Sequence, residues 1–129
     1  MKLLLDTHSL IWWFNDDQRL GPRTRALIAD RENDIFASCV SFWEISIKHR
    51  IGKLPEIGSV IHSEARASGF AILEIEQAHL AKLEELPLDP NFKDPFDNLI
   101  LAQAIVEVET LITGDRKLLK SGIQAIRTK

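Results

Sequence analysis

Short apolar runs alternate along the chain with longer segments in which apolar side chains recur at helical spacing. The short runs predict β-strands, because strands buried in a sheet are brief and almost continuously apolar. They cover residues 2–5, 35–38, 70–75, 110–113 and 123–126. The longer segments predict helices at residues 9–14, 22–31, 41–52, 57–67, 76–85, 95–106 and 115–120. Strands and helices in alternation predict an α/β fold with a central parallel, doubly wound sheet of about four or five strands flanked by helices.

The composition predicts a globular protein with one domain over residues 1–129. Of 129 residues, 45% are hydrophobic and 27% are charged. A chain of this length and composition can bury a hydrophobic core without disulfides or structural metals. No apolar run approaches the ~20 residues of a membrane span, and the acid at position 6 comes too early for a signal peptide. The single cysteine, Cys39, predicts a small buried core residue and a reducing, cytoplasmic location.

Overall charge does not decide the class of partner. The 16 basic and 19 acidic residues give a net charge of −3, which is not typical of a nucleic-acid binder. If several acids gather in one pocket, however, the remaining surface is close to neutral. The basic clusters at residues 48–53 and 116–120 are most simply solvated helix faces. The four histidines share no common spacing, which favours surface or capping roles for them.

Four acidic residues lie in or directly before the first turn of a predicted helix. They are Asp6, Glu44, Asp97 and Asp115. Three of these helices directly follow a short apolar strand. In a parallel sheet such strand-to-helix turns gather along the carboxyl edge, where ligands usually bind. We therefore expect carboxylates far apart in the sequence to meet in one pocket.

Each acid also has a purely structural interpretation as a helix cap. Helix N-termini stabilise negative charge by ~0.3–1 kcal/mol. Ser41 and Glu44 have the spacing of a capping box. Taken singly, each acid is more easily explained as a cap than as a ligand. Asp94, directly before Pro95, is the clearest cap and is left outside the candidate site.

As a group, the four acids need a counter-ion. Two carboxylates ~5 Å apart repel by roughly 3 kcal/mol at an effective dielectric of about 20. An empty cluster would therefore force some of them to take up protons. Mg²⁺ or Mn²⁺ relieves the conflict, because hard cations prefer carboxylate oxygens. Such a site, with water still bound to the metal, suits hydrolysis of a phosphodiester.

Four short motifs carry a resemblance to a known family. They are Leu4-Leu5-Asp6-Thr7-His8, residues 41–48 with Gly52-Lys53-Leu54, residues 93–97 with Ala102-Gln103-Ala104, and residues 111–115. In this order and spacing, from Leu3 to about Leu119, the chain resembles PIN-domain nucleases. The resemblance is closest to VapC-type toxins of prokaryotic type II toxin–antitoxin pairs.

The resemblance implies a three-layer PIN-like fold and a Mg²⁺- or Mn²⁺-dependent endoribonuclease neutralised by a cognate antitoxin protein. It assigns Asp6, Glu44, Asp97 and Asp115 to the catalytic metal set, with Thr113 as a hydroxyl residue that supports the last acid. RNA is the implied substrate, and a homodimer is the expected assembly.

Two features are less settled by the resemblance. Asn98 stands where relatives usually carry a basic residue, so phosphate contact there is in question, with Lys93 or Arg116 as possible substitutes. Trp12 and Trp13 lie in a helix that is apolar nearly all round. One of them is expected to fill the core and the other to be partly exposed. A core helix, a contact with an antitoxin or second subunit, and base stacking all remain open for this segment.

Two other functions fit parts of the pattern. A PIN-fold protein that has lost catalysis would bind RNA or protein only, but acids at all four positions argue against it. A receiver-like phosphoacceptor domain also has an acidic Mg²⁺ pocket. The sequence argues against it, because Thr113 is followed by Gly114-Asp115 rather than by the lysine that such a domain needs.

Overall fold

The computed structural model describes residues 1–107, 109–114 and 125–127. Its strands are β1 (Lys2–Leu5), β2 (Asp34–Ser38), β3 (Ala71–Leu73), β4 (Thr110–Thr113) and β5 (Ala125–Arg127). Its helices are α1 (Thr7–Phe14), α2 (Pro22–Ala29), α3 (Cys39–Arg50), α4 (Gly58–Ala67), α5 (Gln77–Glu85) and α6 (Pro95–Glu107). The predicted α/β class is confirmed. The helix predicted at residues 115–120 lies outside the described residues.

All five strands form one parallel sheet in the order β3-β2-β1-β4-β5. The first strand is therefore central. The chain places β2 and β3 on one side of it and then crosses to place β4 and β5 on the other. The junction between β1 and β4 is a topological switch point, where α/β proteins open a crevice at the carboxyl ends of the strands. This order also differs from the 2-1-3-4-5 order of receiver domains.

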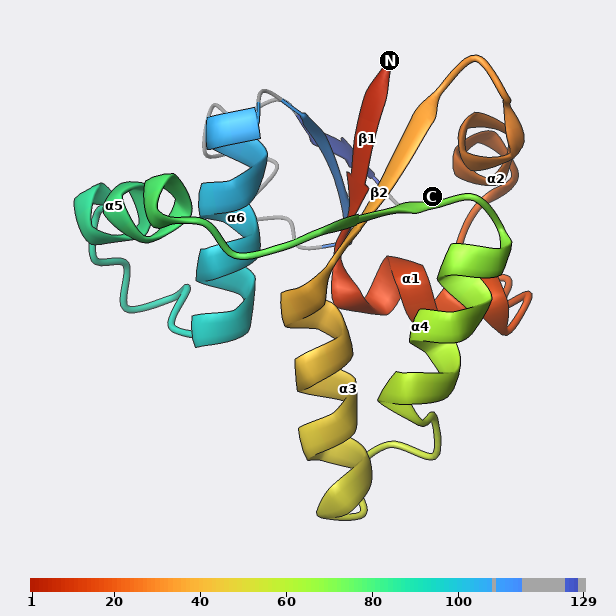
Figure 1. Cartoon of the computed structure of the whole chain (residues 1–129), viewed down its shortest axis with the longest axis horizontal. Helices are drawn as coiled ribbons and strands as arrows, with labels where there is room; N and C mark the ends of the chain where they lie inside the picture. The colour runs from red at the N-terminus through yellow and green to blue at the C-terminus, as the bar shows by residue number, and fades with distance from the viewer. Residues whose placement is uncertain (108, 115–124, 128–129) are drawn as a thin grey trace.

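The sheet separates two hydrophobic clusters, so the molecule has three layers. Alternate residues of a strand face opposite sides. Leu3 and Leu5 pack with residues of α1, α2 and α4, whereas Leu4 packs with Leu99 and Ile100 of α6. Figure 1 shows α5 and α6 on one side of the sheet and α1, α2 and α4 on the other, with α3 running beyond the carboxyl edge.

Helix α3 begins earlier than predicted, which corrects the placement of Glu44. Ser38, at the end of β2, is the N-cap, and its side-chain oxygen accepts the backbone N–H of Val40 at 3.0 Å. The helix starts at Cys39, so Glu44 is its sixth residue and lies in the second turn. The capping box predicted from Ser41 and Glu44 is wrong. Cys39 is half-buried rather than fully buried.

The helix that contains both tryptophans packs against the core without burying either ring completely. Trp12 and Trp13 are each half-buried at the edge of the same hydrophobic cluster. The expected division into one core and one exposed tryptophan is therefore wrong. None of the described helices is long and apolar enough to cross a membrane.

Candidate functional site

A pocket of about 430 Å³ opens at the switch point between β1 and β4. The register pairs Leu5 with Ile112, so the next residues, Asp6 and Thr113, lie side by side at the carboxyl edge. The pocket is lined by Asp6, His8, Trp12, Arg19, Asp97, Thr113 and Gly114. Three of the residues predicted for the site thus meet there: Asp6 directly after β1, Thr113 at the end of β4, and Asp97 in α6.

Asp6 has both of the roles considered for it. It is the N-cap of α1, where its Oδ1 accepts the backbone N–H of Ser9 at 2.8 Å, and it also lines the pocket. Burial raises the pKa of its carboxyl group, and hydrogen bonds with Ser9 and Thr113 oppose that rise only in part. Burial thus favours a proton or a cation on Asp6.

Thr113 is fully buried at the end of β4 and its side chain is hydrogen-bonded to the Asp6 carboxylate. The resemblance implied that this hydroxyl supports the last acid, Asp115. Asp115 lies outside the described residues. Within the described part of the chain, the hydroxyl therefore orients the first acid of the set.

Asp97 enters the pocket from the first turn of α6, as predicted. The neighbouring Asp94 is the cap of this helix, because its Oδ1 accepts the backbone N–H groups of Phe96 at 2.8 Å and Asp97 at 3.1 Å. Leaving Asp94 outside the candidate site is consistent with these bonds. The cap fixes the turn that presents Asp97.

Glu44, which was also predicted for the site, is not one of the residues that line the pocket. Its side chain is almost completely buried. Oε1 accepts the hydroxyl of Thr7 at 2.6 Å, and Oε2 lies 2.5 Å from Nζ of Lys48. Burial opposes the charge on Lys48, but Glu44, with smaller contributions from Asp94 and Asp97, raises the pKa of that ammonium group. Part of the counter-charge that we expected only from a metal is therefore supplied by Lys48.

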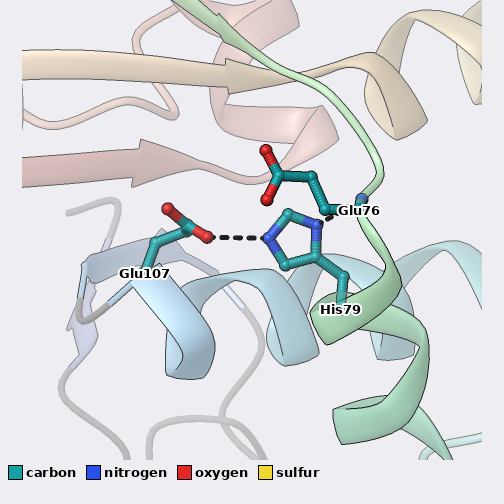
Figure 2. A group of neighbouring side chains, drawn as sticks. All are labelled: Glu76, His79 and Glu107. Carbon is teal, nitrogen blue, oxygen red and sulfur yellow. Dashed lines mark hydrogen bonds and ion pairs between the residues drawn. The ribbon is translucent and has the colours of Figure 1, made fainter.

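A second group of potential metal ligands lies away from this pocket. The ligand atoms of Glu76, His79 and Glu107 all lie within 4.8 Å of one another. Figure 2 shows these three side chains grouped together. His79 Nδ1 accepts the backbone N–H of Glu76 at 3.0 Å, so Nε2 carries the proton and faces Glu107 Oε2 at 2.9 Å. The Glu76 side chain accepts the backbone N–H of His79 in a capping box.

Neither ring nitrogen of His79 therefore has a lone pair left for a metal. The cluster joins the start of α5 to the end of α6, and its role is structural. This agrees with the capping role predicted for the histidines, although His79 is fully buried rather than on the surface.

Several residues around the pocket were not predicted from the sequence. His8, Trp12 and Arg19 line it, and Thr7 and Lys48 hold Glu44. Lys48 follows Glu44 by one helical turn, a spacing that could have indicated the ion pair. Arg19 lies in the loop between α1 and α2, where no periodicity indicates which way a side chain points.

The order of the strands and the meeting of Asp6 and Asp97 at their carboxyl edge define an α/β protein with an acidic pocket at the switch point of its sheet. The family model of the PIN domain matches residues 3–122, and the chain belongs to that family. Ribonuclease VapC16 of Mycobacterium tuberculosis (strain ATCC 25618 / H37Rv) is 39% identical over 61 residues. The match spans 45% of this chain and 43% of that relative, less than half of each.

Solved structures show the same fold over nearly the whole chain. VapBC2 from Rickettsia felis, bound to a DNA fragment from its promoter, has a TM-score of 0.73 at 19% identity and covers 98% of each chain. A toxin–antitoxin complex from Klebsiella pneumoniae has a TM-score of 0.62 at 23% identity and also covers 98% of each chain. The three-layer PIN-like fold is thereby confirmed.

Proposed function

We propose that this protein is a Mg²⁺- or Mn²⁺-dependent endoribonuclease and the toxin of a toxin–antitoxin pair. The observation that carries the proposal is the meeting of Asp6, Asp97 and Thr113 in one pocket at the switch point of the sheet. The name of the ribonuclease relative and the toxin–antitoxin complexes among the structural neighbours support it.

The pocket offers the oxygen ligands that a hard divalent cation prefers. Asp6 and Asp97 hold the cation in this proposal, and Glu44 and Asp115 complete the acidic set. Thr113 helps to orient the Asp6 carboxylate through their hydrogen bond. When bound, the cation polarises the phosphoryl group and lowers the pKa of an attacking water.

Lys48 holds Glu44 in place before a cation binds. Both oxygens of Glu44 have a partner, Thr7 and Lys48, so the side chain is held in one orientation. A metal ion that is coordinated by Glu44 must compete with Lys48 for the Glu44 carboxylate. The raised pKa of Asp6 means that cation binding displaces a proton there at low pH, so metal affinity should rise with pH.

The expected partners follow from the same family membership. A cognate antitoxin would bind this protein and inhibit its cleavage of RNA. We also expect two copies of the chain to form a homodimer. Residues 1–129 would act as one domain in that assembly.

The decisive experiment is cleavage of a single-stranded RNA by the purified protein in Mg²⁺, Mn²⁺ or EDTA. Cleavage should require the cation and should fall by more than about 100-fold in Asp6→Asn. Asp34→Asn is the matched control, because Asp34 is exposed at the amino edge of the sheet. Cleavage in EDTA would refute the metal site. RNA that binds but stays intact with either cation would favour a binding module instead.

A further inference from the structure

We infer that Arg19, stacked on Trp12, binds a phosphate of the RNA beside the candidate site. The inference rests on the proposed function and names the positively charged side chain that would hold the RNA beside the metal site. Arg19 lines the same pocket as Asp6 and Asp97, and its Cζ lies 4.9 Å from the centroid of the Trp12 ring. An acidic pocket repels a polyanion, so a fixed positive charge at its rim is what a nucleic-acid substrate needs.

The loop that carries Arg19 is cross-linked by side chains. Arg25 donates to Asp16 Oδ1 at 2.6 Å and to the carbonyl of Leu20 at 2.9 Å, and a further bond reaches the carbonyl of Asp17. Asp16 has a φ of 51°, a conformation that aspartate tolerates better than most residues. These bonds hold the loop between α1 and α2 in one shape.

Within this loop the guanidinium group of Arg19 is fixed on two sides. Asp17 Oδ1 accepts the backbone N–H of Arg19 at 2.9 Å and Nε at 3.1 Å, and Oδ2 lies 2.7 Å from Nη2. On the other side, its Cζ lies over the Trp12 ring. A side chain positioned in this way loses little conformational entropy when it binds a ligand.

Arg19 is nevertheless accessible to a ligand, since its side chain is 64% exposed. The pair with Asp17 is made through Nε and Nη2, on one edge of the guanidinium fork. A guanidinium has five N–H donors and suits bidentate contact with a phosphate. Arg19 can therefore share its charge between Asp17 and a phosphate, as arginine does at many anion sites.

Within the described part of the chain, three other polar groups considered for phosphate contact, Asn98, Lys48 and Lys93, are bonded to other residues or do not line the pocket. Asn98, at the position where relatives usually have a basic residue, donates its side-chain amide to the carbonyls of Phe92 at 3.1 Å and Asp94 at 2.9 Å. Lys48 is paired with Glu44. Lys93 does not line the pocket. Arg19 supplies the positive charge from a different part of the chain.

The test compares wild type, R19Q, R19K and the control R23Q, in which the changed arginine is exposed on α2. Cleavage with Mn²⁺ gives KM and kcat. The Kd of a labelled single-stranded oligoribonucleotide, measured in Ca²⁺ over a range of salt concentrations, gives the salt slope. Thermal melts report folding of each variant.

R19Q should raise KM and Kd about tenfold, because one charge-assisted contact is lost. Its kcat should stay within about twofold of the wild-type value, since Arg19 positions the substrate rather than reacting. Its salt slope should fall by about 0.7, the change for one phosphate contact on a single strand. R19K should recover the slope, and R23Q should match wild type.

If Arg19 were only structural, R19Q would lower the melting temperature and the activity without changing the salt slope of Kd. That result would overturn the inference. Equal Kd and slope in R19Q and wild type would do the same, while cleavage by wild type would leave the proposed function standing. A wild-type protein that neither binds nor cuts RNA would overturn both.

Discussion

Thr7 donates a hydrogen bond from its hydroxyl to Oε1 of Glu44 at 2.6 Å, although the two residues are 37 positions apart. The Thr7 oxygen also lies 3.0 Å from Oγ of Ser41. Because Thr7 has one hydroxyl proton, it donates to the carboxylate and accepts from Ser41. All three side chains are buried, so this network fixes the start of α1 against α3 beside Asp6.

Glu44→Gln should destabilise the metal-free protein by about 1–3 kcal/mol. The change removes the charge that Lys48 faces at 2.5 Å and leaves a partly buried ammonium group without its partner. If repulsion between the acids dominated instead, the same change would leave the stability equal or higher. Urea denaturation would distinguish the two. The double variant Glu44→Gln/Lys48→Met should recover most of the loss, and a loss that persists would show that Lys48 is not its cause.

Asp6→Asn should leave the metal-free stability equal or higher, whereas Asp6→Ala should lower it by about 1 kcal/mol. Asparagine still accepts the N–H of Ser9 as an N-cap and removes the buried charge, while alanine cannot cap. Melting curves in EDTA compare the variants directly. Both substitutions remove the charge, so equal stability of the two variants would mean that the capping bond contributes little.

Glu109 should make the protein less stable as the pH rises. Its side chain is buried, and Oε2 has no hydrogen-bond partner among the described residues. Burial, with repulsion from Glu107, raises its pKa from the ordinary 4.5 to about 7. The folded state therefore retains a proton that the unfolded chain has lost. The contribution of this proton to the free energy of unfolding is complete below pH 4.5 and disappears as the pH rises through about 7.

Glu109→Gln should remove this dependence and stabilise the protein at pH 8 by roughly 1–2 kcal/mol relative to wild type. At pH 5 the two should be nearly equal. Denaturant titrations at both pH values give the comparison. A constant difference between variant and wild type across this interval would mean that Glu109 titrates normally.

Gly58 should tolerate no side chain, because α3 and α4 touch there. A Cβ at this position would lie 2.0 Å from Oγ of Ser46 and 2.5 Å from the carbonyl oxygen of Phe42. Gly58→Ala should therefore cost about 1–3 kcal/mol through overpacking. Gly52 provides the contrast, since its φ is +78° and nothing lies within 4 Å of a Cβ.

Asparagine tolerates the left-handed region better than alanine, so it should be the milder substitution at Gly52. It should not be milder at Gly58, where space is the limit. Chemical denaturation of the four variants tests this pattern, and an advantage for asparagine at Gly58 would argue against the steric explanation.

The sequence predicted the elements better than it predicted the local chemistry of the site. Each described strand is a short apolar run, and Asp94 before Pro95 is a cap whose signal lies within four residues. The start of α3 was misplaced because Ser38 and Ser41 are both good caps. The choice between them depends on where β2 ends, and pairing with β1 and β3 decides that.

The partners of the acids could not be predicted for a similar reason. The bond between Thr7 and Glu44 and the position of Arg19 over Trp12 depend on the packing of helices that are distant in the sequence. Helix periodicity indicates which face is apolar but not which polar side chains meet. Asp97, by contrast, was placed correctly because its turn lies at a helix start fixed by local signals.

The central position of β1 has a consequence for how the chain is made. One edge of β1 pairs with β2, which has been synthesised once residue 38 is added, but the other edge pairs with β4 and waits for residue 113. In a nascent or interrupted chain that stops before Thr110, the backbone groups along that edge of β1 are unpaired. Such an edge can pair with another chain and promote aggregation. The shortened chain also lacks the Thr113 neighbour of Asp6, so the pocket cannot assemble until residue 113 has been synthesised.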